Sequence, residues 1–330
     1  MTKLTLDEAR ELVIGALLNS DVSRENAGIV ADALVAAEAA GQGGHGLRRV
    51  PAYAAQARAG KTAGHAKPSS FRVRPGVLRI DAQNGFAYPA FDLALEEMPG
   101  IAREQGIALA AINRSHHAGV MGLTVERFAE AGLVAIMVAN APAAMAPWGG
   151  HRALYGTNPL AFAAPVEGDL PIVIDLALSK VARGKIMAAQ QKGAAIPDDW
   201  AFDVNGNPTT DADAAMAGTM APLGGAKGAA LALMVELLAA GLTGANYAFE
   251  ASSLFTDQGP PPSLGQTIIA IDPGASADGV AGRMKEMAEA ISNQEGVRIP
   301  GRRGQGQRAS ALRDGLDIDD EVVAAIRAIG

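Results

Sequence analysis

The 330-residue sequence contains no cysteine, and only 4% of its residues are aromatic. Without cysteine the chain has no disulfide, no thiolate nucleophile and no cysteine-ligated metal. It also lacks a surplus of basic residues, because its formal net charge is −7 at pH 7. General nucleic-acid binders and proteins of anionic membrane surfaces need a basic face, so we expect neither partner.

Long apolar runs and a targeting segment are also missing. The N-terminus has no basic segment followed by an apolar stretch, so no secretory signal is predicted. The most apolar window, residues 228–245, carries Glu236 in its middle and is short for a membrane span, which needs ~20 apolar residues. The window favours a buried core helix. We therefore expect a cytoplasmic globular protein.

The first 70 residues are predicted to be helical. Thr5 and Glu8 form a capping-box pattern before an amphipathic helix over residues 6–18. Ser23 can cap a second helix that runs to about Ala40, and a third helix follows the basic turn near Arg49.

Strands and helices interleave after Phe71, where residues 71–80 alternate like a hairpin around Pro75 and Gly76. The periodicity predicts further strands at 107–112, 133–139, 159–164, 171–176 and 267–272. It predicts helices at 90–104, 121–131, 180–191, 227–241, 276–293 and 318–329. A helical start followed by interleaved elements indicates an α/β fold with segregated subdomains.

Residues 41–46, GQGGHG, superficially match the glycine fingerprint of dinucleotide-binding folds. That fingerprint holds pyrophosphate only when it follows a strand and opens a helix. Here a predicted helix precedes the glycines, so we reject a Rossmann interpretation.

Histidine is rare, with five in the chain, yet His116 and His117 are adjacent in a loop of small residues. No carboxylate is spaced as a metal ligand, so we expect no metal and favour acid–base chemistry, for which imidazole is suited near neutrality. The alternative is one buried structural histidine and one exposed histidine. His45 is equally compatible with a role in the site and with an ordinary loop position.

Cationic residues near glycines suggest sites for anions. Arg49, four residues after His45, could hold a carboxylate with two parallel hydrogen bonds, or be a solvated surface residue. Lys227 follows two glycines at the start of a predicted helix, whose N–H groups could bind a phosphate. Arg302, Arg303 and Arg308 could hold phosphates or form a solvated tail.

Together these segments resemble the malate/L-lactate dehydrogenase-like oxidoreductases. That family includes ureidoglycolate and sulfolactate dehydrogenases and the Δ1-piperideine-2-carboxylate/Δ1-pyrroline-2-carboxylate reductases. The matching blocks are HGLRRVPAY (45–53), SHHAG (115–119), APWGG (146–150), GTNPLAFAAP (156–165), DLALSKVARGK (175–185), GNPTTD (206–211) and LGGAKGAALALMVELLAAGLTG (223–244).

The resemblance implies an α/β fold with a non-Rossmann, mixed-sheet NAD(P)-binding domain at residues 116–265. An N-terminal helical segment (1–70) would precede a second α/β domain for substrate and dimer contacts, built from 71–115 and 266–330. The implied coenzyme is NADPH or NADH, the substrate is a small carboxylate, and the assembly is a homodimer.

The resemblance also assigns roles to single residues. His117 matches the family's proton donor, His45 the histidine beside the substrate, Arg49 the residue that grips the carboxylate, and Thr157 the substrate–nicotinamide junction. The implied coenzyme contacts are His117, Ala118, Gly119, Val120, Met121, Thr157, Asp175, Leu176, Ala177, Lys185, Ala226, Lys227, Gly301, Arg302 and Arg303.

Two positions depart from the cyclic-imine reductases that the chain otherwise resembles most. Those enzymes carry a Ser before the loop histidine and an Asp in the DxAxS…G segment, where this chain has Gly44 and Lys185. Lys185 is the residue type of the hydroxy-acid dehydrogenases. Cyclic ketimines are the first expectation for the substrate, 2-hydroxy acids such as malate, lactate, ureidoglycolate or sulfolactate the second, and an inactive nucleotide-sensing relative the third.

The absence of this Ser and Asp, which with the loop histidine would form a Ser–His–Asp relay, has an electrostatic consequence. A cation such as Lys185 near His45 disfavours imidazolium, so His45 should be neutral at pH 7. The sequence therefore predicts that His117 supplies the proton, with His116 as its neighbour.

Overall fold

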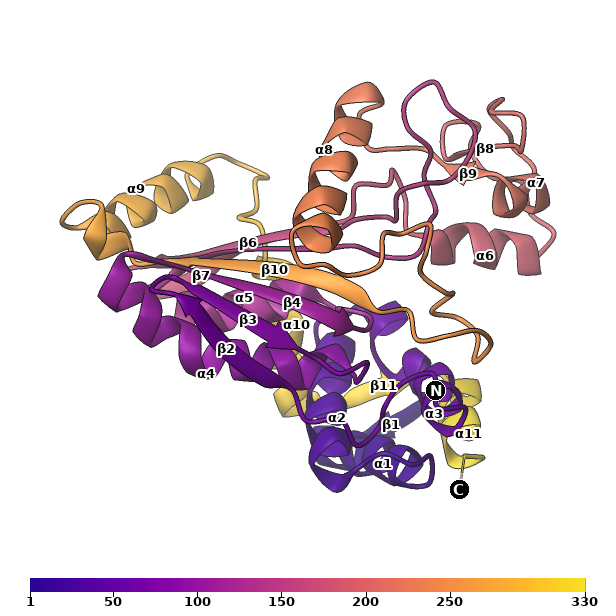
Figure 1. Ribbon diagram of the computed structural model, residues 1–330, viewed down its shortest axis with the longest axis horizontal. Coiled ribbons are helices and arrows are strands. Elements are labelled where there is room, and N and C mark those ends of the chain that lie inside the picture. Colours follow the sequence, from indigo (N-terminus) through magenta and orange to yellow (C-terminus); the bar gives the residue numbers. More distant parts are fainter. Residues whose placement is uncertain (330) are drawn as a thin grey trace.

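The computed structural model describes residues 1–329, and its centre is a seven-stranded mixed sheet (Figure 1). The strand order is β2-β3-β4-β10-β5-β6-β7, and every neighbouring pair is antiparallel except β3 and β4. The strands are β2 (Ser69–Arg74), β3 (Val77–Asp81), β4 (Ile107–Ser115), β5 (Val134–Ala139), β6 (Leu160–Val166), β7 (Asp169–Leu176) and β10 (Leu264–Ile271). The predicted α/β class, without a Rossmann unit, is confirmed.

Strand β10 holds the sheet together. It comes from late in the chain and inserts between β4 and β5, with Ile268 and Ala270 fully buried. Strands from every proposed segment after residue 70 therefore join one sheet. The boundaries of the proposed domains stay a prediction.

The N-terminal part is helical, as predicted. Its helices are α1 (Leu6–Leu18), α2 (Arg24–Ala39) and α3 (Val50–Arg58), with short 3₁₀ turns η1 (Gly43–His45) and η2 (Leu47–Arg49) before α3. The capping box of Thr5 and Glu8 is present, and the Ser23 side chain accepts from the backbone N–H of Asn26. These caps satisfy N–H groups that a helix start leaves unpaired.

The first and last strands of the chain meet beside this helical part (Figure 1). Strand β1 (Thr2–Leu4) pairs with β11 (Leu316–Ile318), and α11 (Asp320–Arg327) packs on α1 and α3. Neither strand was predicted, because three residues are too few to show a two-residue period.

Helices cover both faces of the sheet. On one face α4 (Ala87–Gln105) packs on β4, and α5 (Met121–Glu130) packs on β5, β6 and β7. On the other, α8 (Ala226–Glu236) and the π-helical turn η3 (Leu237–Gly241) lie against β5 and β10. Helix α9 (Val280–Ser292) contacts β6 at the far end of the sheet (Figure 1).

The segment between β7 and β10 forms a lobe beside the sheet, at the upper right of Figure 1. It contains α6 (Arg183–Gln191), β8 (Ala201–Phe202), α7 (Ala212–Ala217), β9 (Thr219–Met220) and α8. A small core of its own, with Ile186, Ile196 and Met220, packs the lobe against Val138 of β5.

One expectation is wrong, and one of two open alternatives is removed. The apolar window 228–245 is not a buried core helix, because Leu231 and Leu237 are 45% and 51% exposed while Ala232 and Val235 are buried. The basic run is not a solvated tail: it opens α10 (Arg302–Asp314) and pairs with acids, Arg302 with Asp169 and Arg308 with Glu126. None of the helices within residues 1–329 is long and apolar enough to span a membrane.

Candidate active site

Two histidines from distant parts of the chain meet in a stacked pair. Nδ1 of His45, at the end of η1, lies 3.2 Å from Nε2 of His117, which follows β4. The rings stack with their centroids 5.1 Å apart and an interplanar angle of 15°. The other ring nitrogen of His117, Nδ1, lies 2.7 Å from the hydroxyl of Tyr53. Both nitrogens of His117 are therefore engaged, whereas Nε2 of His45 has no protein partner within residues 1–329.

The glycines around His45 allow a close approach to α2. The carboxylate of Glu38 accepts from the backbone N–H of Leu47 at 2.8 Å. A Cβ at Gly46 would lie 3.0 Å from the backbone nitrogen of Glu38 and closer still to its side chain. The glycines thus let the loop that carries His45 pack tightly on α2.

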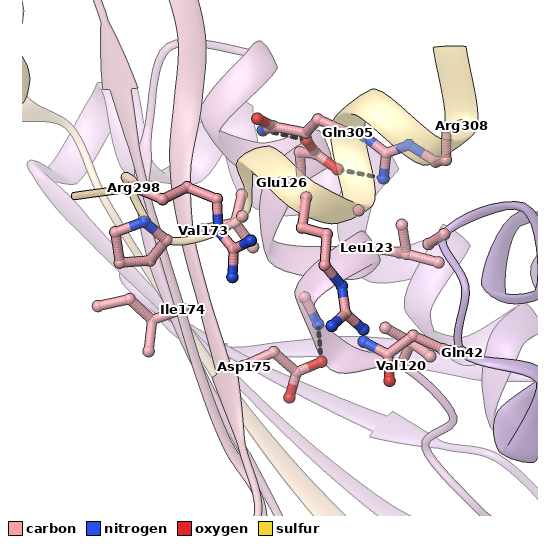
Figure 2. Close-up of a pocket in the computed structure, with 16 residues that line it drawn as sticks. Gln42, Val120, Leu123, Glu126, Val173, Ile174, Asp175, Arg298, Gln305 and Arg308 are labelled. Atoms are coloured by element: carbon pink, nitrogen blue, oxygen red, sulfur yellow. Dashed lines mark hydrogen bonds and ion pairs between the residues drawn. The ribbon is translucent and has the colours of Figure 1, made fainter. Parts of the chain in front are cut away.

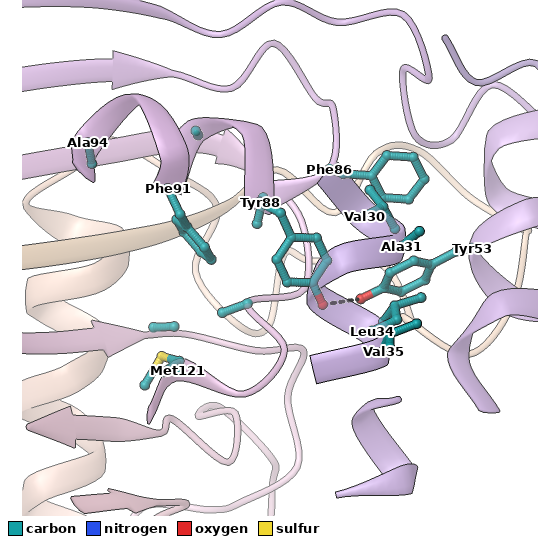
Figure 3. Packing of buried hydrophobic residues seen from close by; sticks show 14 of the residues in the cluster. Val30, Ala31, Leu34, Val35, Tyr53, Phe86, Tyr88, Phe91, Ala94 and Met121 are labelled. Atoms are coloured by element: carbon teal, nitrogen blue, oxygen red, sulfur yellow. Dashed lines mark hydrogen bonds between the residues drawn. The ribbon is translucent and has the colours of Figure 1, made fainter. Parts of the chain in front are cut away.

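Tyr53 of α3 sits behind His117 and is fully buried. Its hydroxyl also lies 3.3 Å from the hydroxyl of Tyr88 on α4, and Figure 3 shows the two hydroxyl groups pointing toward each other. Neither tyrosine was predicted as a site residue from the sequence. The only available signal was that Tyr53 closes the first matching block.

His116 points away from the pair and has a structural role. Its Nε2 donates to Oε1 of Gln56 at 2.7 Å, and Gln56 Nε2 donates to the carbonyls of Leu254 and Thr256. His116 is 1% exposed, and burial, followed by the charges of Lys61 and Arg49, lowers its pKa to about 3.

Arg49 lies beside the pair and is half-buried. Its Nε donates to the carbonyl of Gly44 at 2.8 Å, and its guanidinium carbon lies 5.0 Å from the ring centroid of Phe255. Within residues 1–329 it forms no ion pair. A buried ammonium, Lys61, fixes the Phe255 loop by donating to the carbonyls of Ser253, Thr256 and Gln258 at 2.6–2.9 Å. Arg49 is thus held in place through Nε, and its terminal nitrogens have no hydrogen-bond partner within residues 1–329.

Both histidines of the pair are neutral. Burial, with the Arg49 charge second, lowers the pKa of His45 to about 4. Burial also holds the pKa of His117 well below its usual range, and Arg49, His45 and His116 add to the effect. The predicted neutral form of His45 agrees with this direction, but the predicted cause was wrong. Lys185 lies over the ring of Trp200, 5.8 Å from its centroid, and Arg49 is the cation that acts on His45.

Several of the expected coenzyme contacts line one cavity of about 440 Å³ between α5, β7 and α10 (Figure 2). They are Val120, Asp175, Gly301 and Arg303. Arg298 lines it as well and, with Arg303, supplies guanidinium groups that suit a polyanionic ligand. Arg308 also lines it but pairs with Glu126. Arg302 is not among the lining residues, because it turns away to Asp169.

The carboxylate and the glycine of this cavity fit a dinucleotide. Asp175 accepts from the backbone N–H of Gly122 at 2.7 Å, and burial raises its pKa to about 6. Gly301 has φ +91°, and a Cβ there would lie 2.9 Å from the Cβ of Val173. A carboxylate acceptor, close backbone and nearby guanidinium groups are what the hydroxyls and phosphates of NAD(P) need.

The remaining expected contacts do not line this cavity. The backbone N–H of Leu178 donates to the carbonyl of Thr157, and that of Leu223 donates to Leu178, so the segments that carry Thr157, Ala177 and Ala226 are neighbours. Leu176 ends β7, immediately after Asp175. Lys185 and Lys227 are exposed and do not line the cavity. His117, Ala118, Gly119 and Met121 span the turn from β4 into α5.

The buried carboxylate of Glu236 fixes the backbone beside Thr157. In the sequence Glu236 was noted only because it interrupts an apolar window. Glu236 accepts from Nδ2 of Asn158 at 2.7 Å, from Nδ2 of Asn140 at 3.1 Å and from the backbone N–H of Ala248 at 2.6 Å. Burial raises its pKa, against these bonds. The network holds Asn158 at φ +41° and so fixes the backbone conformation next to Thr157.

Comparison with known proteins agrees with this geometry. Residues 4–327 match the malate/L-lactate dehydrogenase family. The chain is 49% identical to the (2R)-3-sulfolactate dehydrogenase (NADP(+)) of Chromohalobacter salexigens, over 98% of this chain and 97% of that one. It is 42% identical to the Δ1-pyrroline-2-carboxylate/Δ1-piperideine-2-carboxylate reductase of Pseudomonas aeruginosa, over 97% of both chains.

Solved structures give the same result. The crystal structure of the Δ1-piperideine-2-carboxylate reductase from Pseudomonas syringae pvar. tomato superposes with a TM-score of 0.93 at 36% identity, over all of both chains. The sulfolactate dehydrogenase of Methanocaldococcus jannaschii superposes at 0.91 and 29% identity, over 99% of this chain and 96% of that one. The protein is an oxidoreductase. It belongs to the malate/L-lactate dehydrogenase family, which confirms the resemblance seen in the sequence.

Proposed function

We propose that the protein is an NAD(P)H-dependent oxidoreductase that reduces the C2 carbon of a small carboxylate. The observation that carries the proposal is the neutral His45–His117 pair beside Arg49, a half-buried guanidinium without an ion-pair partner in residues 1–329. Bound NAD(P)H supplies the hydride, and the name of the relative (2R)-3-sulfolactate dehydrogenase (NADP(+)) supports this coenzyme. Arg49 would fix the carboxylate next to C2.

The proton chemistry follows from which ring nitrogen is free. Nε2 of His45 is the one nitrogen of the pair without a protein partner in the described chain, so it would face the substrate. His117 would hold the shared proton behind it. The Arg49 charge lowers the pKa values of both rings. A substrate carboxylate bound to Arg49 would raise these pKa values again, so substrate binding would be coupled to proton uptake.

Two substrate classes remain, and the structure supports one more than the other. A 2-oxo acid gains a proton on its oxygen during reduction and needs a positioned acid, whereas a cyclic iminium is already protonated at nitrogen. The acid–base pair, Lys185 and the 49% identity to a sulfolactate dehydrogenase favour a 2-oxo/2-hydroxy acid couple. Cyclic ketimines, the first expectation from the sequence, become the second candidate, supported by the 42% identity to a ketimine reductase.

A substrate panel tests the function. The protein is incubated with NADPH or NADH and either sulfopyruvate, oxaloacetate, pyruvate, Δ1-pyrroline-2-carboxylate or Δ1-piperideine-2-carboxylate, and the loss of reduced-nicotinamide absorbance is followed. We expect turnover of a 2-oxo acid with a higher kcat/KM than either ketimine. Saturable coenzyme binding without turnover of any substrate would instead support the inactive nucleotide-sensing relative.

Arg49→Lys should raise KM strongly with the best substrate, because an ammonium cannot form two parallel hydrogen bonds to a carboxylate. A charge-assisted bond is worth about 1.5–3 kcal/mol, which corresponds to roughly 10- to 150-fold in KM. The matched control is Arg48→Lys, since Arg48 pairs with Asp319 at the surface. Equal KM values for the two variants would return Arg49 to a surface role.

The two histidines should differ in steady-state kinetics. The sequence predicted that His117→Ala would be the crippling change, but the free Nε2 of His45 leads us to expect the reverse. His45→Gln should lower kcat by about 10²–10⁴-fold, the usual size of a general-acid contribution, and His117→Ala by less. His65→Gln, at an exposed pair with Asp21, is the control. A mild His45→Gln beside a severe His117→Ala would restore the first assignment; two mild variants would favour an iminium substrate.

We also propose that the protein is a homodimer and that the apolar face around α8 is the interface. Its large side chains are at least 40% exposed, a patch of the kind that marks protein contacts: Leu231, Leu233, Met234, Leu237 and Leu242. In sedimentation at micromolar concentration the wild type should be dimeric and Leu237→Glu monomeric. Leu312→Glu, at an apolar side chain that is 76% exposed on α10, should stay dimeric. An active wild-type monomer would contradict the proposal.

A further inference from the structure

Behind the histidine pair lies a chain of hydroxyl groups that the proposed reaction does not yet use. We propose that Tyr53, with Tyr88 behind it, keeps a proton on Nδ1 of His117 and thereby makes Nε2 of His45 the one atom where the pair gains or loses a proton. Tyr53 is a positioning residue in this proposal, because it contacts His117 and not the substrate. The inference rests on the proposed function, which gives the pair its acid–base role.

Counting protons on the two rings leads to this assignment. The pair has four ring nitrogens but only three proton positions, because Nδ1 of His45 and Nε2 of His117, 3.2 Å apart, share one hydrogen bond. The other two positions are Nε2 of His45 and Nδ1 of His117. When the pair carries one extra proton it holds three, so all three positions are filled. Nδ1 of His117 then necessarily carries a proton and donates it to the oxygen of Tyr53, 2.7 Å away.

The neutral pair holds two protons, and the tyrosines decide where. If Tyr53 donated to His117, the protons would lie on Nε2 of His45 and in the shared bond, and His45 could not act as a base. If Tyr53 accepts, they lie in the shared bond and on Nδ1 of His117, and Nε2 of His45 keeps its lone pair. The second arrangement is what remains after the protonated pair gives one proton to the substrate. Tyr53 therefore does not need to turn during the reaction.

Tyr53 can accept from His117 only if its own O–H points elsewhere. The oxygen of Tyr88 provides that acceptor at 3.3 Å. Tyr53 is fully buried and Tyr88 is 8% exposed, so water competes little for these bonds. Burial, the first cause for each, raises the pKa of both tyrosines, so both remain neutral hydroxyl groups.

The other groups around the pair oppose protonation. Arg49 of η2, His116 after β4 and His45 itself all lower the pKa of His117, and Lys61 beyond α3 acts on His116. The hydroxyl of Tyr53 is the neutral acceptor among the groups that face His117, and a hydrogen bond to the charged form favours that form. Tyr53 thus supports the protonated pair in a site whose charges disfavour it.

Tyr53→Phe tests the assignment through the pH profile. Reduction uses the protonated pair, so its kcat/KM falls as pH rises through the pKa of the pair. Loss of the acceptor lowers that pKa, and the falling limb should move to lower pH by about one to two units. At pH 8 kcat/KM should fall about 10- to 100-fold, with KM for the carboxylate nearly unchanged. The matched control is Tyr247→Phe, because the hydroxyl of Tyr247 forms no hydrogen bond within residues 1–329.

Tyr88→Phe shows whether the two hydroxyls act in series. In the wild-type background this variant should shift the limb the same way, because Tyr53 would turn its O–H toward His117. In the Tyr53→Phe background it should have no further effect on kcat/KM, since Tyr88 acts only through Tyr53. Additive losses with an unshifted limb would mean that the tyrosines only pack the core, and would overturn the proposal.

A measurement without turnover separates this inference from the proposed function. ¹⁵N spectra of labelled histidine distinguish an N–H nitrogen from one with a lone pair. The wild type should show a proton on Nδ1 of His117 and a lone pair on Nε2 of His45, and Tyr53→Phe should lose this preference. A proton on Nε2 of His45 in the neutral wild type, or a limb that moves to higher pH in Tyr53→Phe, would show that Tyr53 donates and would overturn the proposal. Absence of turnover with the NMR pattern intact would reject only the proposed reaction.

Discussion

The site depends on the hydrogen bonds that one side of the α3 region makes to two other parts of the chain. Tyr53 bonds to His117 at the end of β4. Gln56, three residues on, joins His116 to the loop before β10, and Lys61 holds the same loop through three carbonyls. Residues three apart on a helix share a face, so a short helix can fix both histidines and the Phe255 loop together. Each bond satisfies a buried polar group, and loss of one partner would leave the other unpaired.

Burial has an electrostatic consequence that runs through the whole site. The histidines are kept neutral because their charged forms lose hydration, and the positive charge of Arg49 adds to this. The same desolvation raises the pKa values of Asp175 and Glu236, although hydrogen bonds to their charged forms oppose it. The site therefore holds few charges before ligands bind, and Arg49 is the cation closest to the pair. A carboxylate bound to Arg49 would change the pKa of every titratable group around it.

The predictions from sequence succeeded where a signal was local. The caps at Thr5 and Ser23, the hairpin near Pro75 and the long strands and helices all carry their periodicity within the segment itself. Rejection of a Rossmann loop at 41–46 was also local, because no strand precedes it. The failures were non-local: β1 needs its partner β11 from the other end of the chain. Helix α10 has a weak pattern and is held by ion pairs to β7 and α5.

The sequence by itself determined the family, the α/β class and the short set of residues that includes His45, His117 and Arg49. Tertiary structure decided what each of them contacts. Two adjacent residues in extended backbone point to opposite sides, so the sequence indicates that His116 and His117 face different ways. It does not show which of the two contacts His45. The register of β4 in the sheet and the position of α3 made that choice, by bringing Gln56 to His116 and Tyr53 to His117. Such contacts join residues about 60 positions apart, and no pattern within either segment encodes them.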